Sequence, residues 1–276
     1  MYYEVHRSAP KVLTRQMAGR YLAENVRIPK YTDIIANGAF QKRNVIQSVQ
    51  FPSTLSRIGA NAFYGCYFLR SVQLPAKLCE LGMQAFADCQ NLTTATLPAS
   101  LPTLSRDVFK ADRKLTSVSF YGDDGMRVIQ PNAFCECTSL TDIALPDTVT
   151  EIGSRAFYRC KSLSSLLLPA SIRKIGVQAF YFCAFPELYL PESLEVLEDS
   201  AFFKCVNLAW IRLPENVRYI GKWAFHGCNR LQYLEVRHDP EFIGEWIINR
   251  ATTVRCYQRS KMDRYCRENG FQVEYL

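Results

Sequence analysis

Histidine is scarce in this sequence, and the residue patterns of common enzymes are missing. His6, His226 and His238 are the only three among 276 residues, and none has a partnered nucleophile in the sequence. There is no P-loop, GxGxxG, HExxH or GxSxG motif. A CxxC pair or histidine cluster, typical of zinc sites, is also missing. We therefore predict no enzymatic activity, no metal and no cofactor.

Long hydrophobic runs are missing as well. No stretch approaches the roughly 20 apolar residues that a membrane-spanning helix needs. Residues 1–16 contain neither the apolar core of a signal peptide nor a small-residue cleavage site. We expect a cytoplasmic protein whose cysteines are reduced.

A 23-residue repeat runs through most of the chain. An Ala-Phe dipeptide, replaced once by Val108-Phe109, recurs every 23 residues apart from one interval of 25 and one of 22, and an apolar-Pro pair keeps the same period. The Phe positions are Phe40, Phe63, Phe86, Phe109, Phe134, Phe157, Phe180, Phe202 and Phe225. Fixed-period similarity of this kind indicates a solenoid of stacked repeats. We predict one structural domain, with an N-terminal cap at 1–27, a nine-repeat solenoid at 28–250 and a C-terminal cap at 251–276.

One repeat already suggests its own local structure. In residues 69–86, Val72 and Leu74 fit one face of a short strand, and Pro75 lacks the N–H that would continue it. Gly82 permits a tight bend before Ala85-Phe86, where we expect a short helical or 3₁₀ turn. Successive strands then run parallel with right-handed crossovers. The expected fold is an α/β solenoid, a right-handed horseshoe with one parallel sheet on its concave face.

Cysteine recurs with the same period. Seven of the eleven cysteines lie three residues after the repeat Phe, and the total is odd. Side chains in such a column point in parallel into the core, which is poor geometry for disulfides. We predict a ladder of reduced, buried thiols.

Both ends of the chain carry cap signals. Leu13, Met17 and Tyr21 recur every four residues, which predicts an amphipathic helix over the first repeat. Ser260 can cap a helix over 261–269 that ends at Gly270, and 271–275 is typical of a final strand.

The outward-facing strand positions change character along the chain. The first half carries mainly Ser, Thr and Gln, whereas the second half gathers larger side chains typical of interface hot spots. We predict a partner-binding site there. Its residues are Leu167, Tyr189, Trp210, Arg212 and Tyr233. The open alternative is that Trp210 and Tyr233 are covered by the C-terminal cap or pack on each other.

Three further features have simpler explanations. Residues 1–43 hold eight Lys or Arg and three acids (8 − 3 = +5), which suits either an anionic partner or a solvated terminal face. A second aromatic column is expected to pack between repeats; it consists of Tyr64, Tyr158, Tyr181 and Phe203, followed by His226. The segment 121–125 lengthens one repeat, and we expect an ordinary surface turn there rather than a calcium site.

A family resemblance follows from these columns. The pattern LPxSLxxIGxxAFxxCxxLxxVxLP, present as PDTVTEIGSRAFYRCKSLSSLLLP in residues 146–169, resembles the BspA-type leucine-rich repeat proteins. Residues 252–276 also look like the closing segment of such arrays. The resemblance implies bacterial or protist binding proteins without catalysis in the repeats. It also makes a secreted or surface location the alternative to a cytoplasmic one.

We therefore predict a non-enzymatic scaffold that recognises a protein or peptide on its concave face. One alternative is a nucleic-acid or anionic-polymer binder that uses Lys11, Arg15 and Arg20 at the basic end. The other is a surface adhesin for host matrix or carbohydrate. The sequence leaves the oligomeric state open.

Overall fold

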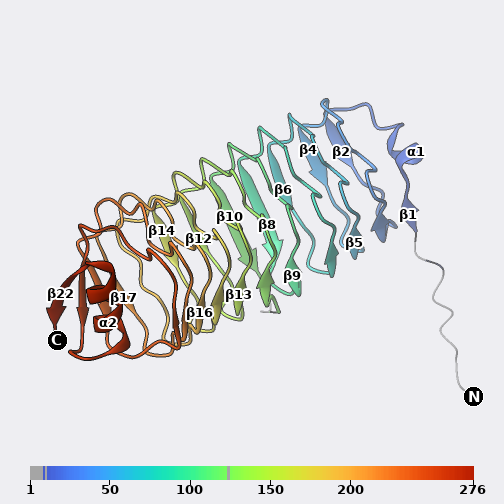
Figure 1. Cartoon of the computed structure of the whole chain (residues 1–276). Coiled ribbons are helices and arrows are strands. Elements are labelled where there is room, and N and C mark those ends of the chain that lie inside the picture. The colour runs from blue at the N-terminus through green and yellow to red at the C-terminus, as the bar shows by residue number, and fades with distance from the viewer. Residues whose placement is uncertain (1–8, 10, 123–124) are drawn as a thin grey trace, which may run out of the picture.

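The chain forms a parallel β-solenoid of about eleven turns with few helices (Figure 1). The computed structural model describes residues 9, 11–122 and 125–276. One turn of the solenoid is called a rung here. Strand β1 and helix α1 lie at one end of the stack, and α2 and β22 lie at the other (Figure 1).

The longer strands form the first side of the solenoid, called the long-strand face. Their central residues, such as Val26 and Val72, are buried apolar side chains. These strands are β2 (Asn25–Arg27), β4 (Ser48–Gln50), β6 (Ser71–Gln73), β8 (Thr94–Pro98), β10 (Ser117–Tyr121), β12 (Asp142–Ala144), β14 (Ser165–Leu167), β17 (Trp210–Leu213), β19 (Tyr233–Val236), β21 (Thr253–Cys256) and β22 (Gln272–Tyr275). They pair in three parallel sheets, in the orders β10-β8-β6-β4-β2, β12-β14 and β17-β19-β21-β22.

A second set of strands, each two residues long, forms the short-strand face. Sequence patterning did not reveal it, because two residues cannot show a period of two. The strands are β1 (Val12–Leu13), β3 (Ile34–Ile35), β5 (Arg57–Ile58), β7 (Glu80–Leu81), β9 (Thr103–Leu104), β11 (Val128–Ile129), β13 (Glu151–Ile152), β15 (Lys174–Ile175), β16 (Val196–Leu197), β18 (Tyr219–Ile220) and β20 (Phe242–Ile243). Gly82 follows β7 because a Cβ there would collide with the backbone of Ala60 in the previous rung.

The Ala-Phe segments form hydrogen-bonded turns instead of the expected helical or 3₁₀ turns. Each turn contains two residues in the left-handed region, such as Asn61 (φ 55°) and Gly65 (φ 68°), which interrupts helical geometry. The N–H groups of Asn61, Phe63 and Gly65 donate to carbonyl oxygens one rung later, at 2.9, 2.7 and 2.9 Å. Equivalent bonds link the other rungs in the same direction.

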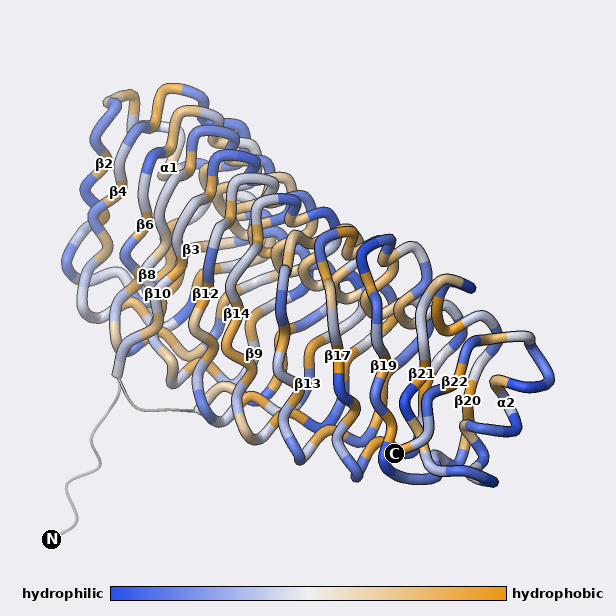
Figure 2. Tube along the Cα trace, turned by 90° about the vertical axis from the view of Figure 1, so that its left-hand side faces the viewer, coloured by the Kyte–Doolittle hydropathy of each residue, from blue (hydrophilic) through white to orange (hydrophobic). Residues whose placement is uncertain are grey.

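The nine repeat Phe side chains form one continuous buried column. Consecutive rings are stacked, with centroids 5.0–5.9 Å apart. The solenoid predicted from the period is thereby confirmed. In Figure 2, apolar segments recur at neighbouring positions along successive rungs.

The cysteine column also lies in the core, and its thiols are free. Each of its seven Sγ atoms lies 3.1–3.3 Å from the carbonyl oxygen of the Phe in the preceding rung, as Cys66 does with Phe40. The thiols thus hydrogen-bond to the backbone as well as filling space. Burial raises the pKa of Cys66 to about 12, so this thiol stays protonated at neutral pH.

Asp112 interrupts the cysteine column at its fourth rung. Its side chain is completely buried, and its Oδ1 accepts a hydrogen bond from the Cys89 N–H at 2.7 Å. Its Oδ2 has no hydrogen-bond partner. Burial raises the pKa of Asp112 well above its usual range. Burial therefore favours the protonated, neutral form of this carboxyl group, which occupies the place of a thiol.

At the N-terminus the predicted helix is wrong. Helix α1 spans only Arg15–Ala18, Leu13 belongs to β1, and the Met17 side chain is 42% exposed. Strand pairing with the next rungs, β1 with β3 and β2 with β4, overrides the four-residue periodicity. Tyr21 covers the first ring of the Phe column, edge-on to Phe40 at 5.9 Å.

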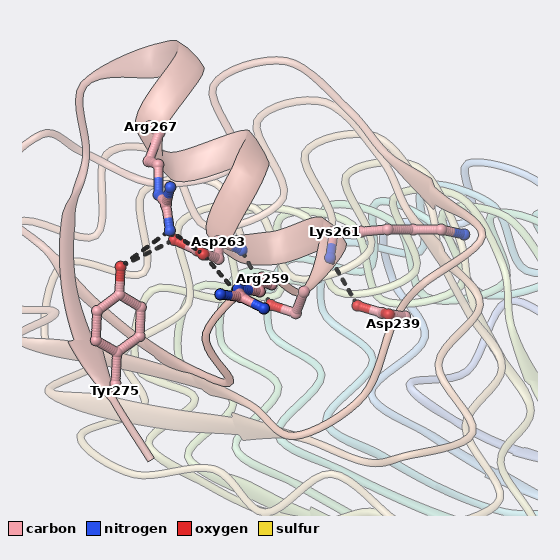
Figure 3. A network of polar contacts seen from close by, with 7 residues as sticks. Asp239, Arg259, Lys261, Asp263, Arg267 and Tyr275 are labelled. Atoms are coloured by element: carbon pink, nitrogen blue, oxygen red, sulfur yellow. Dashed lines mark hydrogen bonds and ion pairs between the residues drawn. The ribbon is translucent and has the colours of Figure 1, made fainter.

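The C-terminal elements are confirmed. Ser260 caps α2 (Lys261–Asn269), Gly270 ends it with φ 70°, and β22 pairs in parallel with β21. The Asp263 carboxylate accepts hydrogen bonds from Arg267, the Arg259 N–H and the Tyr275 hydroxyl (Figure 3). This network fixes α2 and β22 against each other at the end of the core.

The longest repeat interval, from Phe109 to Phe134, contains the five-residue strand β10, which pairs with the equally long β8 of the preceding rung. Asp123 and Asp124 of the predicted surface turn lie outside the described residues, so the alternative of a calcium site is not addressed by the structure.

The buried carboxyl group leads to a stability prediction. Because the folded-state pKa of Asp112 lies above the unfolded value of about 3.9, stabilisation by the bound proton is complete below that value and is lost as the pH rises toward the folded pKa. Asp112→Cys should raise the free energy of unfolding at pH 7 by about 1–3 kcal/mol. It should also reduce the loss of stability between pH 5 and pH 8, measured by urea denaturation under reducing conditions. Asp147→Cys, at an exposed site, is the control, and an unchanged pH dependence for Asp112→Cys would contradict the assignment.

Thiol accessibility gives a second prediction. Among the eleven cysteines only Cys79 is exposed. A short pulse of iodoacetamide at pH 8 should therefore alkylate Cys79 alone, because the other ten thiols are shielded in the folded state. Intact-mass and peptide mass spectrometry would measure this. Cys79→Ser should stay unlabelled in the same pulse, and rapid labelling of Cys137 or Cys160 would contradict the buried ladder.

Candidate partner-binding surface

A depression on the long-strand face is lined by three of the predicted site residues, Tyr189, Trp210 and Arg212. It lies where the repeat interval is 22 residues. Pro186 and the shortened connection leave residues 187–189 without strand pairing, so the sheet is interrupted between β14 and β17. Phe185 fills the core there, edge-on to Phe180 at 5.6 Å. The shorter rung thus opens a gap in an otherwise regular surface.

Two apolar side chains beside this depression are largely open to solvent. Tyr189 is 73% exposed, and Leu167, at the end of β14, is 80% exposed. Trp210 is half-buried at the start of β17. Together they present apolar and aromatic surface at the point where the sheet is broken.

The fifth predicted residue, Tyr233, is less available. It pairs in register with Trp210, but the guanidinium of Arg255 lies 4.1 Å from its ring centroid. Arg255 belongs to β21 at the C-terminal end of the chain. The alternative in which this end shields the aromatic residues therefore applies to Tyr233. Helix α2 itself packs against β21 and β22.

Arg212 belongs to a column of alternating charge. Along β17, β19, β21 and β22 the outward residues are Arg212, Glu235, Arg255 and Glu274. Arg212 Nε lies 3.8 Å from Glu235 Oε1, which also accepts from Arg237 at 2.8 Å. Glu235 is buried and shared with Arg237, and Arg212 Nε has no hydrogen-bond partner among the described residues.

From Tyr158 onward, the second aromatic column packs between rungs as predicted. Tyr158 stacks on Tyr181 at 4.7 Å, Tyr181 on Phe203 at 5.3 Å, and Phe203 on His226 at 5.7 Å.

At the opposite end, Lys11, Arg15 and Arg20 are exposed, and the Lys11 ammonium lies 4.8 Å from the Tyr31 ring centroid.

Sequence reasoning missed an aromatic cluster on the short-strand face. Tyr219 and Phe242 stack at 4.7 Å, and both are partly exposed. Trp223 and Trp246 follow them by four residues, in the adjoining turns, with φ 57° and 52°, a conformation that is costly for bulky side chains. The 23-residue spacing of both pairs was the available signal. This spacing could not be interpreted from the sequence, because the short-strand face was not predicted.

Two further searches concern the described residues only. No group of three or more His, Cys, Asp or Glu side chains in the described segments is arranged to hold a metal ion. Within those segments, no helix has the length and apolar character required to cross a membrane.

Comparison with known proteins supports the repeat assignment. A model of the BspA-type leucine-rich repeat region matches residues 19–125 and 127–255 in six copies. A search of the curated proteins found no match.

One solved structure supports the fold, and a second aligns less well. A leucine-rich repeat protein from Eubacterium ventriosum aligns with a TM-score of 0.58 and 23% identity, over 61% of this chain but only 45% of that one. A leucine-rich cell surface protein from Faecalibacterium prausnitzii aligns with a TM-score of 0.46 and 20% identity, over 91% of this chain and 87% of that one. The family model spans most of the sequence, and the chain belongs to the BspA-type leucine-rich repeat family.

Proposed function

We propose that the protein is a non-enzymatic scaffold that binds a protein or peptide through its long-strand face, the concave side in a leucine-rich repeat horseshoe. The single observation behind this proposal is the depression at Tyr189, Trp210 and Arg212, with Leu167 exposed on the preceding rung. Tyr, Trp and Arg are the residue types enriched at interface hot spots. At the broken sheet edge, a partner can fit into the depression and bury the exposed apolar side chains.

The energetic roles of the three lining residues differ. Tyr189 is mostly exposed, so its burial by a partner would release water from a large apolar surface. Trp210 is already half-buried and forms the wall, while Arg212 Nε has no hydrogen-bond partner among the described residues and can donate to a bound partner. Tyr189 is therefore the best residue for separating binding from folding.

The cellular location is also a proposal. Seven free thiols in one buried column suit a reducing compartment, which favours the cytoplasm over the cell surface. A surface adhesin role would require export, and the two locations can be separated by cell fractionation.

Mutation of Tyr189 tests the proposed site. Tyr189→Ala should change the free energy of unfolding by less than about 0.5 kcal/mol, because the side chain is exposed. The same substitution should weaken binding of a captured protein partner by about tenfold or more. Partners would be captured by cross-linking on immobilised wild-type protein, identified by mass spectrometry, and their affinities measured with purified proteins.

Tyr219→Ala is the matched control, because Tyr219 is an exposed aromatic residue on the short-strand face. It should leave the affinity unchanged. Equal partner affinities for wild type and Tyr189→Ala would contradict the site. Loss of binding with Tyr219→Ala alone would move the site to the short-strand face.

A further inference from the structure

Two adjoining depressions at the N-terminal end of the long-strand face form one groove across three rungs. The first depression extends from Arg27 and Lys30 to Gln50 and Phe51, and the second continues to Gln73. Gln50, Phe51 and Ser53 line both. The groove lies several rungs from the Tyr189 depression and is independent of the function proposed above.

Tyr121 borders the groove in its second depression. It comes from the lengthened strand β10 and donates a hydrogen bond from its hydroxyl to the Leu74 carbonyl at 2.6 Å, 47 residues away in sequence. Phe51, where most other repeats have Leu, is half-buried and packs edge-on against Phe63 at 5.7 Å. The groove thus has aromatic and proline surface beside polar side chains.

The polar groups of the groove are arranged in a definite order. Arg27 and Lys30 are exposed at one end, and no carboxylate lines either depression. Gln50 and Gln73 follow along the groove, and both are exposed. Within the described residues, these four side chains form no hydrogen bond or ion pair with the protein. The groove therefore offers positive charge at one end and neutral amides, which both donate and accept, along the rest.

The spacing of the amides discriminates between ligand classes. Gln50 and Gln73 lie one rung apart, and the neighbouring Phe rings show a rung spacing of 5.0–5.2 Å. Side chains on one face of an extended peptide repeat about every 6.6 Å, so a peptide falls out of step with the amides. One pyranose ring of an extended glycan advances by about one rung. A nucleic acid would need cations along the whole groove, whereas here they lie at one end.

We propose that this groove binds an acidic oligosaccharide. The sugar carboxylate meets Arg27 and Lys30, hydroxyl groups of the following rings hydrogen-bond to Gln50 and Gln73, and the apolar face of a ring packs on Phe51. The Arg–carboxylate contact contributes most to the affinity, and the amides fix the position of the sugar rings along the groove.

Trigalacturonate is the probe, and its methyl ester is the neutral counterpart with the same rings. Isothermal titration calorimetry at low ionic strength should show binding of trigalacturonate to the full chain and at least about tenfold weaker binding of the ester. The double variant Arg27→Ala/Lys30→Ala should lose affinity for trigalacturonate to a similar extent. Phe51→Leu restores the residue common to the other repeats, so it should fold normally and still bind more weakly.

The double variant Arg15→Ala/Arg20→Ala removes two charges from the same end outside the groove, and it should bind trigalacturonate almost as wild type does. An equal loss in both double variants would overturn the proposal, because the binding would then be general attraction to a basic end. Equal affinity for the acid and the ester, or no binding of either, would also overturn it. Tighter binding of triglutamate or of an oligonucleotide would assign the groove to another class of ligand.

Discussion

The whole structure depends on hydrogen bonding from each rung to the next at a constant spacing. Long strands, short strands and Ala-Phe turns all contribute backbone bonds along the same axis. The stacked Phe rings and the thiol ladder can form only because these bonds keep equivalent side chains in register. A residue that differs from its column, such as Asp112, is therefore enclosed by neighbours suited to a thiol, and it stays neutral.

The same constraint leaves few places where a surface can specialise. Each of the two proposed binding surfaces includes a residue from one of the two exceptions to the 23-residue interval. The 22-residue interval breaks the sheet and exposes Tyr189, and the 25-residue interval lengthens β10 so that Tyr121 reaches the Leu74 carbonyl. Both changes in repeat length thus alter the long-strand face.

For the outward columns, the sequence predicted the direction of the side chains but not their exposure to solvent. Alternation along a strand placed Tyr189, Trp210 and Tyr233 on one face, since successive side chains point to opposite sides of a sheet. Partial coverage of Tyr233 by Arg255 depends on β21, whose distance from Tyr233 in the sequence follows no repeat. The stacked pair of Tyr219 and Phe242 was not predicted, because a two-residue strand has no detectable pattern.

The sequence by itself determined the solenoid, its period, the buried Phe and Cys columns and the C-terminal helix, because each follows from local spacing repeated many times. Only the tertiary structure decided that there are two strand faces and that each Ala-Phe turn contains two residues with left-handed backbone geometry. It also decided that Leu13 lies in a strand and not in a longer N-terminal helix. These outcomes depend on the hydrogen bonds of a neighbouring rung, which compete with local preference and are not encoded within any single repeat.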